Sequence, residues 1–223
     1  MGNASIYRCT HSSMEQDLVD VLKRTNALYT DGHFVGTSGR HMSVYINKDA
    51  LLPHTAETSR VGELFAAKNK DIPIDIVVGP AMGAIILAQW TAYHLSRLLG
   101  KEILAIYTDK TADNNQILKR GYDKLVAGKN ILIVEDATTT GGSIAKVVES
   151  IRGAGGNVVQ TCVMVNRDVE HVTSEAVGAP FSWLAAISAE SFEEGECQMC
   201  KDGMPINTNV GHGKKYIEFK KIV

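Results

Sequence analysis

Residues 131–143, which read ILIVEDATTTGGS, carry the most informative chemistry in the chain. Their apolar start predicts a buried strand, and Glu135 and Asp136 stand at its mouth, where carboxylates are costly unless they meet cations, sugar hydroxyls or water. The hydroxyl and glycine residues that follow lead into a helix, whose N–H groups and positive end form a cradle for phosphate. Because the acids precede the glycines and no lysine follows them, the run is neither a P-loop nor a dinucleotide fingerprint. We expect a ligand with a phosphate and a sugar diol.

Two other strand ends carry unusual residues. Residues 77–83 read VVGPAMG and offer backbone amides without side-chain bulk, although glycines after a strand are commonly only a tight turn. Residues 163–168 read VMVNRD and place Arg167 where a strand ends. A guanidinium there can grip a carboxylate or the carbonyl edge of a base. The alternative is a solvated arginine paired with Asp168 or Glu170.

The elements that position these residues follow an alternating pattern. Short apolar runs alternate with helical patterns, and the central runs lack polar residues, which predicts an α/β fold with a parallel sheet covered on both faces. Ligands in such folds bind beyond the carboxyl ends of the strands. The expected strands are 74–79, 103–107, 131–134, 158–165 and 183–187, and the expected helices are 12–29, 56–67, 84–99 and 143–152.

The chain is expected to form a single domain with three parts. Residues 1–54 supply an N-terminal helix and a small hood or lid, residues 55–190 the α/β core, and residues 191–223 an irregular tail. Residues 108–122 are polar with little apolar anchoring, so we expect a mobile loop or an exposed hairpin over the site.

Composition narrows the class of protein. The 223 residues are 44% hydrophobic and 22% charged with a formal net charge of -2, which fits a globular protein and argues against a whole-chain electrostatic grip on nucleic acid. We find neither a transmembrane run nor a secretory signal, and therefore expect no membrane partner and a cytoplasmic location. The four cysteines are then expected as reduced thiols.

Residues 131–143 resemble the signature of type I phosphoribosyltransferases, and GPAMG at residues 79–83 resembles the version found in orotate phosphoribosyltransferases. The resemblance implies the type I phosphoribosyltransferase fold and binding of 5-phosphoribosyl-1-pyrophosphate. Glu135 and Asp136 would hold the ribose hydroxyls. The 5′-phosphate would be bound by Ala137, Thr138, Thr139, Thr140, Gly141, Gly142 and Ser143, and the pyrophosphate by Pro80, Ala81, Met82, Gly83 and Lys110.

The same resemblance implies a reaction in pyrimidine (UMP) biosynthesis. Orotate phosphoribosyltransferases transfer the phosphoribosyl group to orotate and give orotidine 5′-monophosphate and pyrophosphate, with Mg²⁺ held through the substrates rather than by side chains. It also implies a homodimer. The catalytic residues implied are Glu135, Asp136, Lys110 and Arg120, and the orotate contacts are Thr139, Arg167, Phe34 and Ser38.

The N-terminal part of the resemblance rests on His33, Phe34, Ser38, Gly39, His41 and Tyr45. Some family members carry a lysine where this chain has Thr37, so no lysine contact to the base is carried over. Read as structure only, Phe34 and Tyr45 are core aromatics.

Two predictions leave alternatives open: the catalytic residue of the loop of residues 108–122, and the base that receives the phosphoribosyl group. The RKExKxHG run of many family members is absent from residues 108–122, whose LKRGY end resembles a shorter-loop subgroup. Lys110, Lys119 and Arg120 are its available cations. Because base choice depends on Arg167 and the hood, a purine (xanthine, hypoxanthine or adenine) phosphoribosyltransferase remains an alternative. A non-catalytic regulator of the same fold that senses nucleotides is the other.

Cys197 and Cys200 could form half of a zinc site, since two thiolates at this spacing fit one metal. A second pair is missing from the pattern, because Cys9 and Cys162 stand alone and the seven histidines show no metal-ligand spacing. One subgroup of the family has a similar CxxCxxGxP tail. We therefore expect mainly a structural turn, with zinc binding as the alternative.

Overall fold

The computed structural model describes residues 13–36, 39–188 and 191–220, and the chain divides into two compact units. The core unit comprises residues 1–21 and 52–188, and the second unit comprises residues 22–51 and 189–223. The predicted hood and the predicted tail thus fold together. Ser12, the expected start of the first helix, lies outside the described residues, and helix α1 covers Ser13–Arg24.

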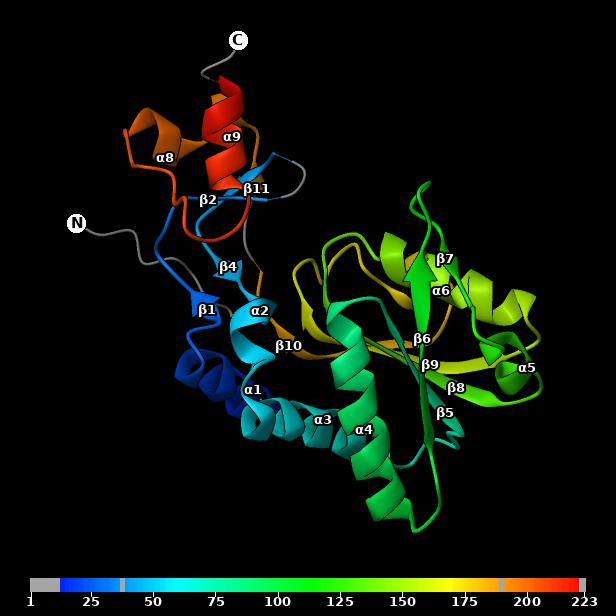
Figure 1. The fold of residues 1–223 in the computed structure, drawn as a ribbon. Coiled ribbons are helices and arrows are strands. Elements are labelled where there is room, and N and C mark those ends of the chain that lie inside the picture. The colour runs from blue at the N-terminus through cyan, green and yellow to red at the C-terminus, as the bar shows by residue number, and fades with distance from the viewer. Residues whose placement is uncertain (1–12, 37–38, 189–190, 221–223) are drawn as a thin grey trace. The chain divides into compact units, whose positions relative to one another are not determined.

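A six-stranded sheet dominates the described part of the core unit (Figure 1). Its order is β10-β9-β8-β5-β6-β7, with every pair parallel except the antiparallel edge pair β6 and β7. The parallel α/β class is therefore confirmed, with an antiparallel edge strand added. The strands are β5 (Ile76–Pro80), β6 (Leu104–Lys110), β7 (Gln116–Ile117), β8 (Asn130–Thr138), β9 (Asn157–Asn166) and β10 (Phe181–Ala186).

Helices cover both faces of this sheet (Figure 1). Helices α3 (Thr55–Asn69) and α4 (Gly83–Leu99) pack together on one face, and α6 (Gly142–Gly153) packs on the other. Gly100 ends α4 in the left-handed conformation with φ 64°, which glycine adopts without a steric penalty. The short helices α5 (Tyr122–Val126) and α7 (Ser174–Val177) complete the described helices of this unit.

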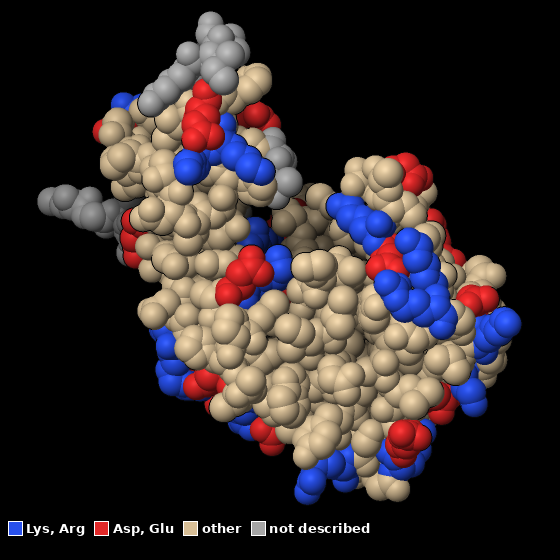
Figure 2. All heavy atoms as spheres, in the orientation of Figure 1, with Lys and Arg blue, Asp and Glu red and all other residues tan. Residues whose placement is uncertain are grey.

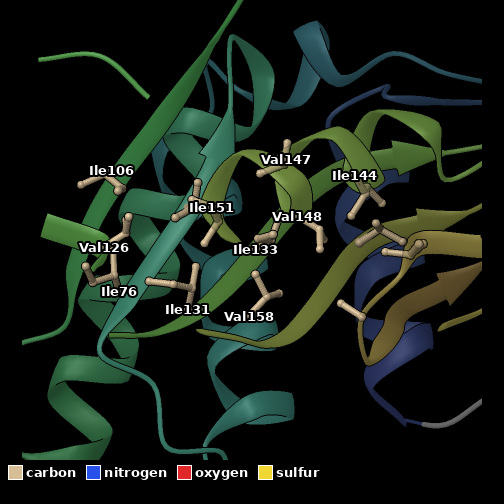
Figure 3. Close-up of a cluster of buried hydrophobic side chains, with 14 of the residues drawn as sticks. Ile76, Ile106, Val126, Ile131, Ile133, Ile144, Val147, Val148, Ile151 and Val158 are labelled. Carbon is tan, nitrogen blue, oxygen red and sulfur yellow. The ribbon is translucent and has the colours of Figure 1, made fainter. Parts of the chain in front are cut away.

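Branched aliphatic side chains fill the space under α6 (Figure 3). Ile76 and Val78 of β5 face this cluster, so the pleat turns Val77 between them toward the opposite face. All three are at most 1% exposed, which explains why the strand reads as a continuous apolar run. The labelled residues in Figure 3 are Ile76, Ile106, Val126, Ile131, Ile133, Ile144, Val147, Val148, Ile151 and Val158.

Strand β8 continues past the apolar run that predicted it. The sequence places the strand end at Val134, whereas β8 extends to Thr138 and pairs Ala137 with Val165 and Thr138 with Asn166 of β9. The acids interrupt the apolar pattern but not the ladder, because main-chain hydrogen bonds to a neighbouring strand do not depend on side-chain polarity. Glu135 and Asp136 are therefore strand residues.

The second unit contains two small antiparallel sheets. Strand β1 (Leu28–Tyr29) pairs with β4 (Tyr45–Ile46), and β3 (His41–Met42) lies between β2 (Phe34–Val35) and β11 (Ser191–Phe192). Strands β3 and β11 pair although they come from opposite ends of the chain. The remaining described elements of this unit are α2 (Lys48–Leu51), η1 (Glu194–Glu196), α8 (Gln198–Lys201) and α9 (Gly213–Lys220).

The expectation of an irregular tail is wrong. Residues 191–220 form a strand and three helical segments, and they bond to the N-terminal part of the second unit. Asn207 donates its N–H to the His33 carbonyl at 2.7 Å, and His212 donates to the Val35 carbonyl at 2.9 Å. The short helical segments lack a long periodic pattern, which hides them from sequence reasoning.

Within the described residues, none of the helices combines the length and apolar character needed to cross a membrane.

Gly79 sets how closely β5 approaches α4. A Cβ atom at this position would lie 2.1 Å from the Ala84 carbonyl oxygen and 3.0 Å from the Ala88 Cβ. Backbone cannot move aside as a side chain can, so Gly79→Ala must push the strand away from the helix.

We expect Gly79→Ala to lower the free energy of unfolding by roughly 1–3 kcal/mol, the usual cost of overpacking. Urea unfolding followed by circular dichroism measures it. The matched control is Gly153→Ala at the end of α6, where an added Cβ meets nothing within 4 Å. An unchanged unfolding midpoint for Gly79→Ala would contradict this description of the β5–α4 contact.

Candidate functional site

The candidate site lies where β5 and β8 part. These neighbours pair only as far as Val78 with Ile133. Beyond that point β5 stays with β6 up to Pro80, and β8 stays with β9 up to Thr138. The strand order reverses here, since β6 and β7 lie on one side of β5 and β8, β9 and β10 lie on the other. Such a switch point opens a crevice at the carboxyl ends of parallel strands.

A cavity of about 160 Å³ occupies this crevice. Its lining contains an acid, two cations and the end of β5, so it suits an anionic ligand that also carries hydroxyl groups. The lining residues are Pro80, Ala81, Lys110, Asn114, Gln116, Glu135, Ser143 and Lys146. The predicted Glu135, Lys110, Ser143, Pro80 and Ala81 are thus brought together.

The two carboxylates are held by the main chain around them. Glu135 Oε1 accepts from the Asp136 N–H at 3.1 Å, and Asp136 Oδ1 accepts from the Ala137 N–H at 2.6 Å. Both side chains are half-buried. A carboxylate oriented by backbone donors loses little entropy when it accepts hydrogen bonds from sugar hydroxyls.

Thr138 shapes the loop between β8 and α6. Its buried hydroxyl accepts the N–H of Gly141 at 2.9 Å, and Gly141 has a left-handed φ of 76°. This turn starts α6 at Gly142 and directs the first helical N–H groups toward the carboxyl edge of the sheet. Thr139, Thr140 and Ser143 are exposed around it, so their hydroxyls face solvent at the positive end of the helix.

The loop at the end of β5, residues 80–83, is tied to β6 on one side and exposes Met82 to solvent. Ala81 donates its N–H to the Thr108 carbonyl at 2.9 Å, which ties the loop to β6. Met82 follows a cis peptide bond and is 82% exposed, and Gly83 begins α4. The predicted pyrophosphate residues therefore lie at the same edge as the acids.

Residues 108–122 begin as a hairpin, as one of the two readings of the sequence expected. The Thr108 hydroxyl donates to the Gln116 side-chain oxygen at 2.7 Å in a buried bond that joins β6 to β7. At the tip, the Asn115 N–H donates to the Thr111 hydroxyl at 2.9 Å. The ammonium group of Lys146, on α6, donates to the Asn114 carbonyl at 2.8 Å. The hairpin tip is thereby held beside the cavity.

Arg120 lies outside the lining of this cavity. It pairs with Asp109 at 2.5 Å, and its guanidinium carbon lies 5.2 Å from the centre of the Tyr107 ring. The hydrogen bond to Asp109 raises the pKa of Arg120, which keeps it cationic. Its catalytic role stays a prediction, because these contacts also explain it as a structural residue.

Arg167 follows β9 at the same edge of the sheet. Its N–H donates to the Thr138 carbonyl at 2.9 Å, so the arginine stands beside the acidic loop. Asp168, one of the two partners considered for a solvated Arg167, contacts His171, whose Nδ1 lies 2.9 Å from the carboxylate. That contact raises the pKa of His171. Asn166, just before Arg167, is fully buried, and its Nδ2 has no hydrogen-bond partner among the described residues.

The predicted base contacts of the hood lie in the second unit or beyond the described residues. Phe34 is 2% exposed and stacks on Tyr45 with ring centres 5.7 Å apart, with Tyr29 at 5.8 Å on its edge. Phe34 is thus a core aromatic, whereas Tyr45 is only half-buried, and a base contact by Phe34 stays a prediction. Thr37 and Ser38 lie outside the described residues.

Sequence reasoning missed Lys146, Asn114 and Gln116. Lys146 follows Ser143 by three residues on α6, so the helical period places it one turn beyond the phosphate loop. That spacing could have identified it. Asn114 and Gln116 reach the cavity because β7 folds back on β6. The polar composition of residues 108–122 does not show which of their side chains face the cavity.

Charges of both signs alternate with broad uncharged areas on the face shown in Figure 2.

Comparison with known proteins adds a family assignment. A family model described as "Phosphoribosyl transferase domain" matches residues 47–177. An orotate phosphoribosyltransferase of Caldanaerobacter subterraneus subsp. tengcongensis is 32% identical over 193 residues, 86% of this chain and 96% of that protein. The one from Heliobacterium modesticaldum is 36% identical over 198 residues, 86% and 96% of the two chains.

Solved structures agree. The crystal structure of orotate phosphoribosyltransferase from Aeropyrum pernix is 27% identical, covers 76% of this chain and 93% of that chain, and has a TM-score of 0.59. The Mycobacterium tuberculosis H37Rv enzyme in complex with inorganic phosphate has a TM-score of 0.60 at 22% identity, covering 77% and 96%. The latter likeness supports the fold alone.

The bond between Thr138 and Gly141 generates a prediction about the loop. We expect Thr138→Val to cost roughly 1–3 kcal/mol of unfolding free energy, because it leaves the buried Gly141 N–H without an acceptor. Thr138→Ser keeps the hydroxyl and serves as the control. Thermal unfolding of both variants measures the difference, and equal stability of valine and serine variants would show that the bond does not shape the loop.

Proposed function

We propose that this chain, which belongs to the phosphoribosyltransferase family and within it to the orotate phosphoribosyltransferases, transfers the 5-phosphoribosyl group of 5-phosphoribosyl-1-pyrophosphate to orotate. A ring nitrogen of orotate forms a bond to C1 of the ribose while the bond from C1 to the pyrophosphate oxygen breaks. The products are orotidine 5′-monophosphate and pyrophosphate. The observation that supports the roles proposed below is the position of Glu135 and Asp136 beside the point where β5 and β8 separate.

In this proposal the acids hold the ribose. Glu135 lines the cavity, and both carboxylates are oriented by main-chain N–H groups, so they can accept hydrogen bonds from the 2- and 3-hydroxyls of a pentose. The positive charge that develops on the sugar as pyrophosphate leaves is stabilised by nearby anions. The acids therefore contribute to binding and to the rate.

The loop of residues 138–143 is assigned to the 5′-phosphate. The exposed hydroxyls of Thr139, Thr140 and Ser143 surround the N-terminus of α6, whose dipole favours a dianion. The distance along the chain from Glu135 to this loop is short, which suits a ligand whose diol and phosphate belong to one sugar.

Lys110 and Lys146 are assigned to the pyrophosphate, together with the loop of residues 80–83. Both lysines line the cavity at the end of β5. Their charges lower the free energy of the leaving group as it gains negative charge. Lys146 also ties the hairpin tip through Asn114, so anion binding and hairpin position depend on the same ammonium group.

Magnesium fits this donor set. Oxygen ligands suit Mg²⁺, and the pyrophosphate and the ribose hydroxyls of the substrate, which Glu135 and the two lysines would position, would supply them. When bound, the ion neutralises charge on the pyrophosphate. The residues of the chain orient the sugar, hold the anions and exclude water.

The hairpin of β6 and β7 is assigned to water exclusion. It is exposed, yet its base is pinned by the buried Thr108–Gln116 bond and its tip by Lys146. A rigid base with a tip held by one surface contact suits a segment that opens for substrate and closes before bond cleavage. Orotate is assigned to Arg167 and Thr139 at this edge, while Phe34 and Ser38 keep their predicted roles from the family resemblance.

We expect the double variant Glu135→Gln with Asp136→Asn to lower kcat/KM for 5-phosphoribosyl-1-pyrophosphate by about 10²–10³-fold, the effect of removing groups that stabilise charge in a transition state. Orotate consumption followed by absorbance measures it. Asp123→Asn, an exposed carboxylate on α5, is the matched control.

Thermal unfolding of the double variant separates lost chemistry from lost folding. Unchanged turnover would overturn the assigned roles of the acids. Turnover of the wild-type chain with a purine base but not with orotate would overturn the assigned substrate, and no turnover with either base would favour a regulator.

The proposal includes a homodimer in the cytoplasm. Helix α4 exposes apolar side chains that share one face, since Ile86 is 40% exposed and Tyr93, seven residues later, is 46% exposed. Exposed apolar side chains that share one helix face suit an interface between two chains.

Light scattering after size exclusion should give twice the 24.2 kDa chain mass, and Ile86→Glu with Tyr93→Glu should shift the protein to the single-chain mass. The control is Leu125→Glu on α5, where the side chain is 43% exposed. A single-chain mass for the wild type would contradict the dimer, and a dimeric double variant would place the interface elsewhere.

A further inference from the structure

Four side chains with metal-binding atoms lie close together in the second unit, and none of them has a role in the proposed reaction. They are His33, His41, Cys197 and Cys200, and their ligand atoms all lie within 4.8 Å of one another. His33 is 2% exposed, and His41 and Cys197 are fully buried. Cys200 is partly buried, and bringing two buried imidazoles next to two thiols is costly without a common partner for their lone pairs.

The spacing of these atoms matches a tetrahedron around one metal ion. His33 Nε2 lies 3.8 Å from Cys197 Sγ and 3.7 Å from Cys200 Sγ, and His41 Nδ1 lies 3.3 Å from Cys200 Sγ. Zinc bonds of about 2.0–2.1 Å to nitrogen and 2.3 Å to sulfur imply edges of roughly 3.3–3.8 Å. The two nitrogens, 2.7 Å apart, lie closer than that and would separate slightly around an ion.

Local bonding already orients His33 as a ligand. Its Nδ1 lies 2.8 Å from the Met204 carbonyl oxygen, which can only accept, so Nδ1 carries the proton and Nε2 turns its lone pair toward the cysteines. A ligating histidine typically donates its other N–H to a carbonyl or a carboxylate in this way. The Met204 carbonyl therefore serves as the outer partner of the cluster.

The ring of His41 is oriented by packing. It lies edge-on to Tyr216 of α9 with ring centres 5.0 Å apart, and its position in the middle strand of the β11-β3-β2 sheet restricts the side chain further. Its Nε2 is buried without a hydrogen-bond partner among the described residues. Only Nδ1 faces the other three ligands, so the ring presents a single nitrogen to an ion.

The cysteines are presented by a tight helical turn. Cys197 follows η1 and precedes α8, and its carbonyl accepts the Lys201 N–H at 3.2 Å, while the carbonyl of Cys200 accepts the Gly203 N–H at 3.1 Å. This turn brings both thiols to one side. The histidines supply the second pair that the sequence pattern lacks, and Cys197 lies 164 residues after His33.

We infer that His33, His41, Cys197 and Cys200 bind one structural Zn²⁺. Two imidazoles and two thiolates form a closed tetrahedral set, which leaves no position for substrate, so the ion stabilises rather than reacts. It would join the N-terminal and C-terminal segments of the second unit, a small unit with one two-stranded and one three-stranded sheet among its described residues.

Metal analysis of the purified full chain, equilibrated with zinc and then dialysed, tests this inference. We expect about one zinc per chain in the wild type, and at least a tenfold loss of affinity in Cys200→Ser and in His41→Ala. The control is Cys162→Ala, which removes a thiol of β9 in the core unit, where burial raises the pKa of Cys162 and keeps it inert. It should bind zinc like the wild type.

Cobalt substitution of the wild-type chain gives a readout that does not depend on the variants folding. Replacement of zinc should produce the visible bands of tetrahedral Co²⁺ and the charge-transfer band of bound thiolates. Absence of these bands, zinc binding that survives loss of either ligand, or a wild-type chain that takes up no metal and holds a Cys197–Cys200 disulfide instead would each overturn the site. This test does not measure orotate turnover, so a failure of the zinc inference leaves the proposed function unaffected.

Discussion

The separation of β5 from β8 beyond Val78 and Ile133 is the constraint on which the described site depends. Two strands that pair through their apolar middles and then follow different neighbours leave main-chain groups and side chains facing a crevice. Glu135 stands on one side of the opening and the Pro80 loop on the other. The site requires no unusual catalytic group, because the sheet itself places an acid pair, a phosphate-binding helix start and two lysines around one cavity.

Packing behind the crevice makes that arrangement rigid. The aliphatic cluster under α6 fixes the helix whose first turn faces the cavity, and the close approach at Gly79 fixes α4 against β5. The loops between these elements are short. Thr138 holds the turn at Gly141 by a side-chain bond, and Lys146 holds the hairpin from outside. Apolar burial therefore positions the scaffold, whereas single polar contacts position the loops.

The sequence predicts this core well because its signals are local. The apolar run before Glu135 and the Thr-Gly-Ser run after Asp136 identify strand, loop and helix within 13 residues. The extension of β8 through the acids is missed because it depends on pairing with β9, not on composition. The sequence predicts a hairpin over residues 108–122 only as one of two alternatives, and the contribution of Gln116 to the cavity depends on the pairing of β7 with β6.

The second unit is the part that local patterns fail to describe. Its strands β3 and β11 are two residues long and come from opposite ends of the chain. Arg40 joins them by donating to Ser191 and pairing with Glu193 at 2.6 Å, a tertiary contact that no spacing reveals. The histidines and cysteines look scattered in the sequence for the same reason, since their proximity arises only when this unit folds.

A structure of the chain with 5-phosphoribosyl-1-pyrophosphate and Mg²⁺ bound tests the central claim most directly. The account predicts the ribose hydroxyls against the carboxylates of Glu135 and Asp136, with the 5′-phosphate enclosed by residues 138–143. A sugar phosphate bound away from the parting of β5 and β8, with these carboxylates facing only solvent, would contradict it.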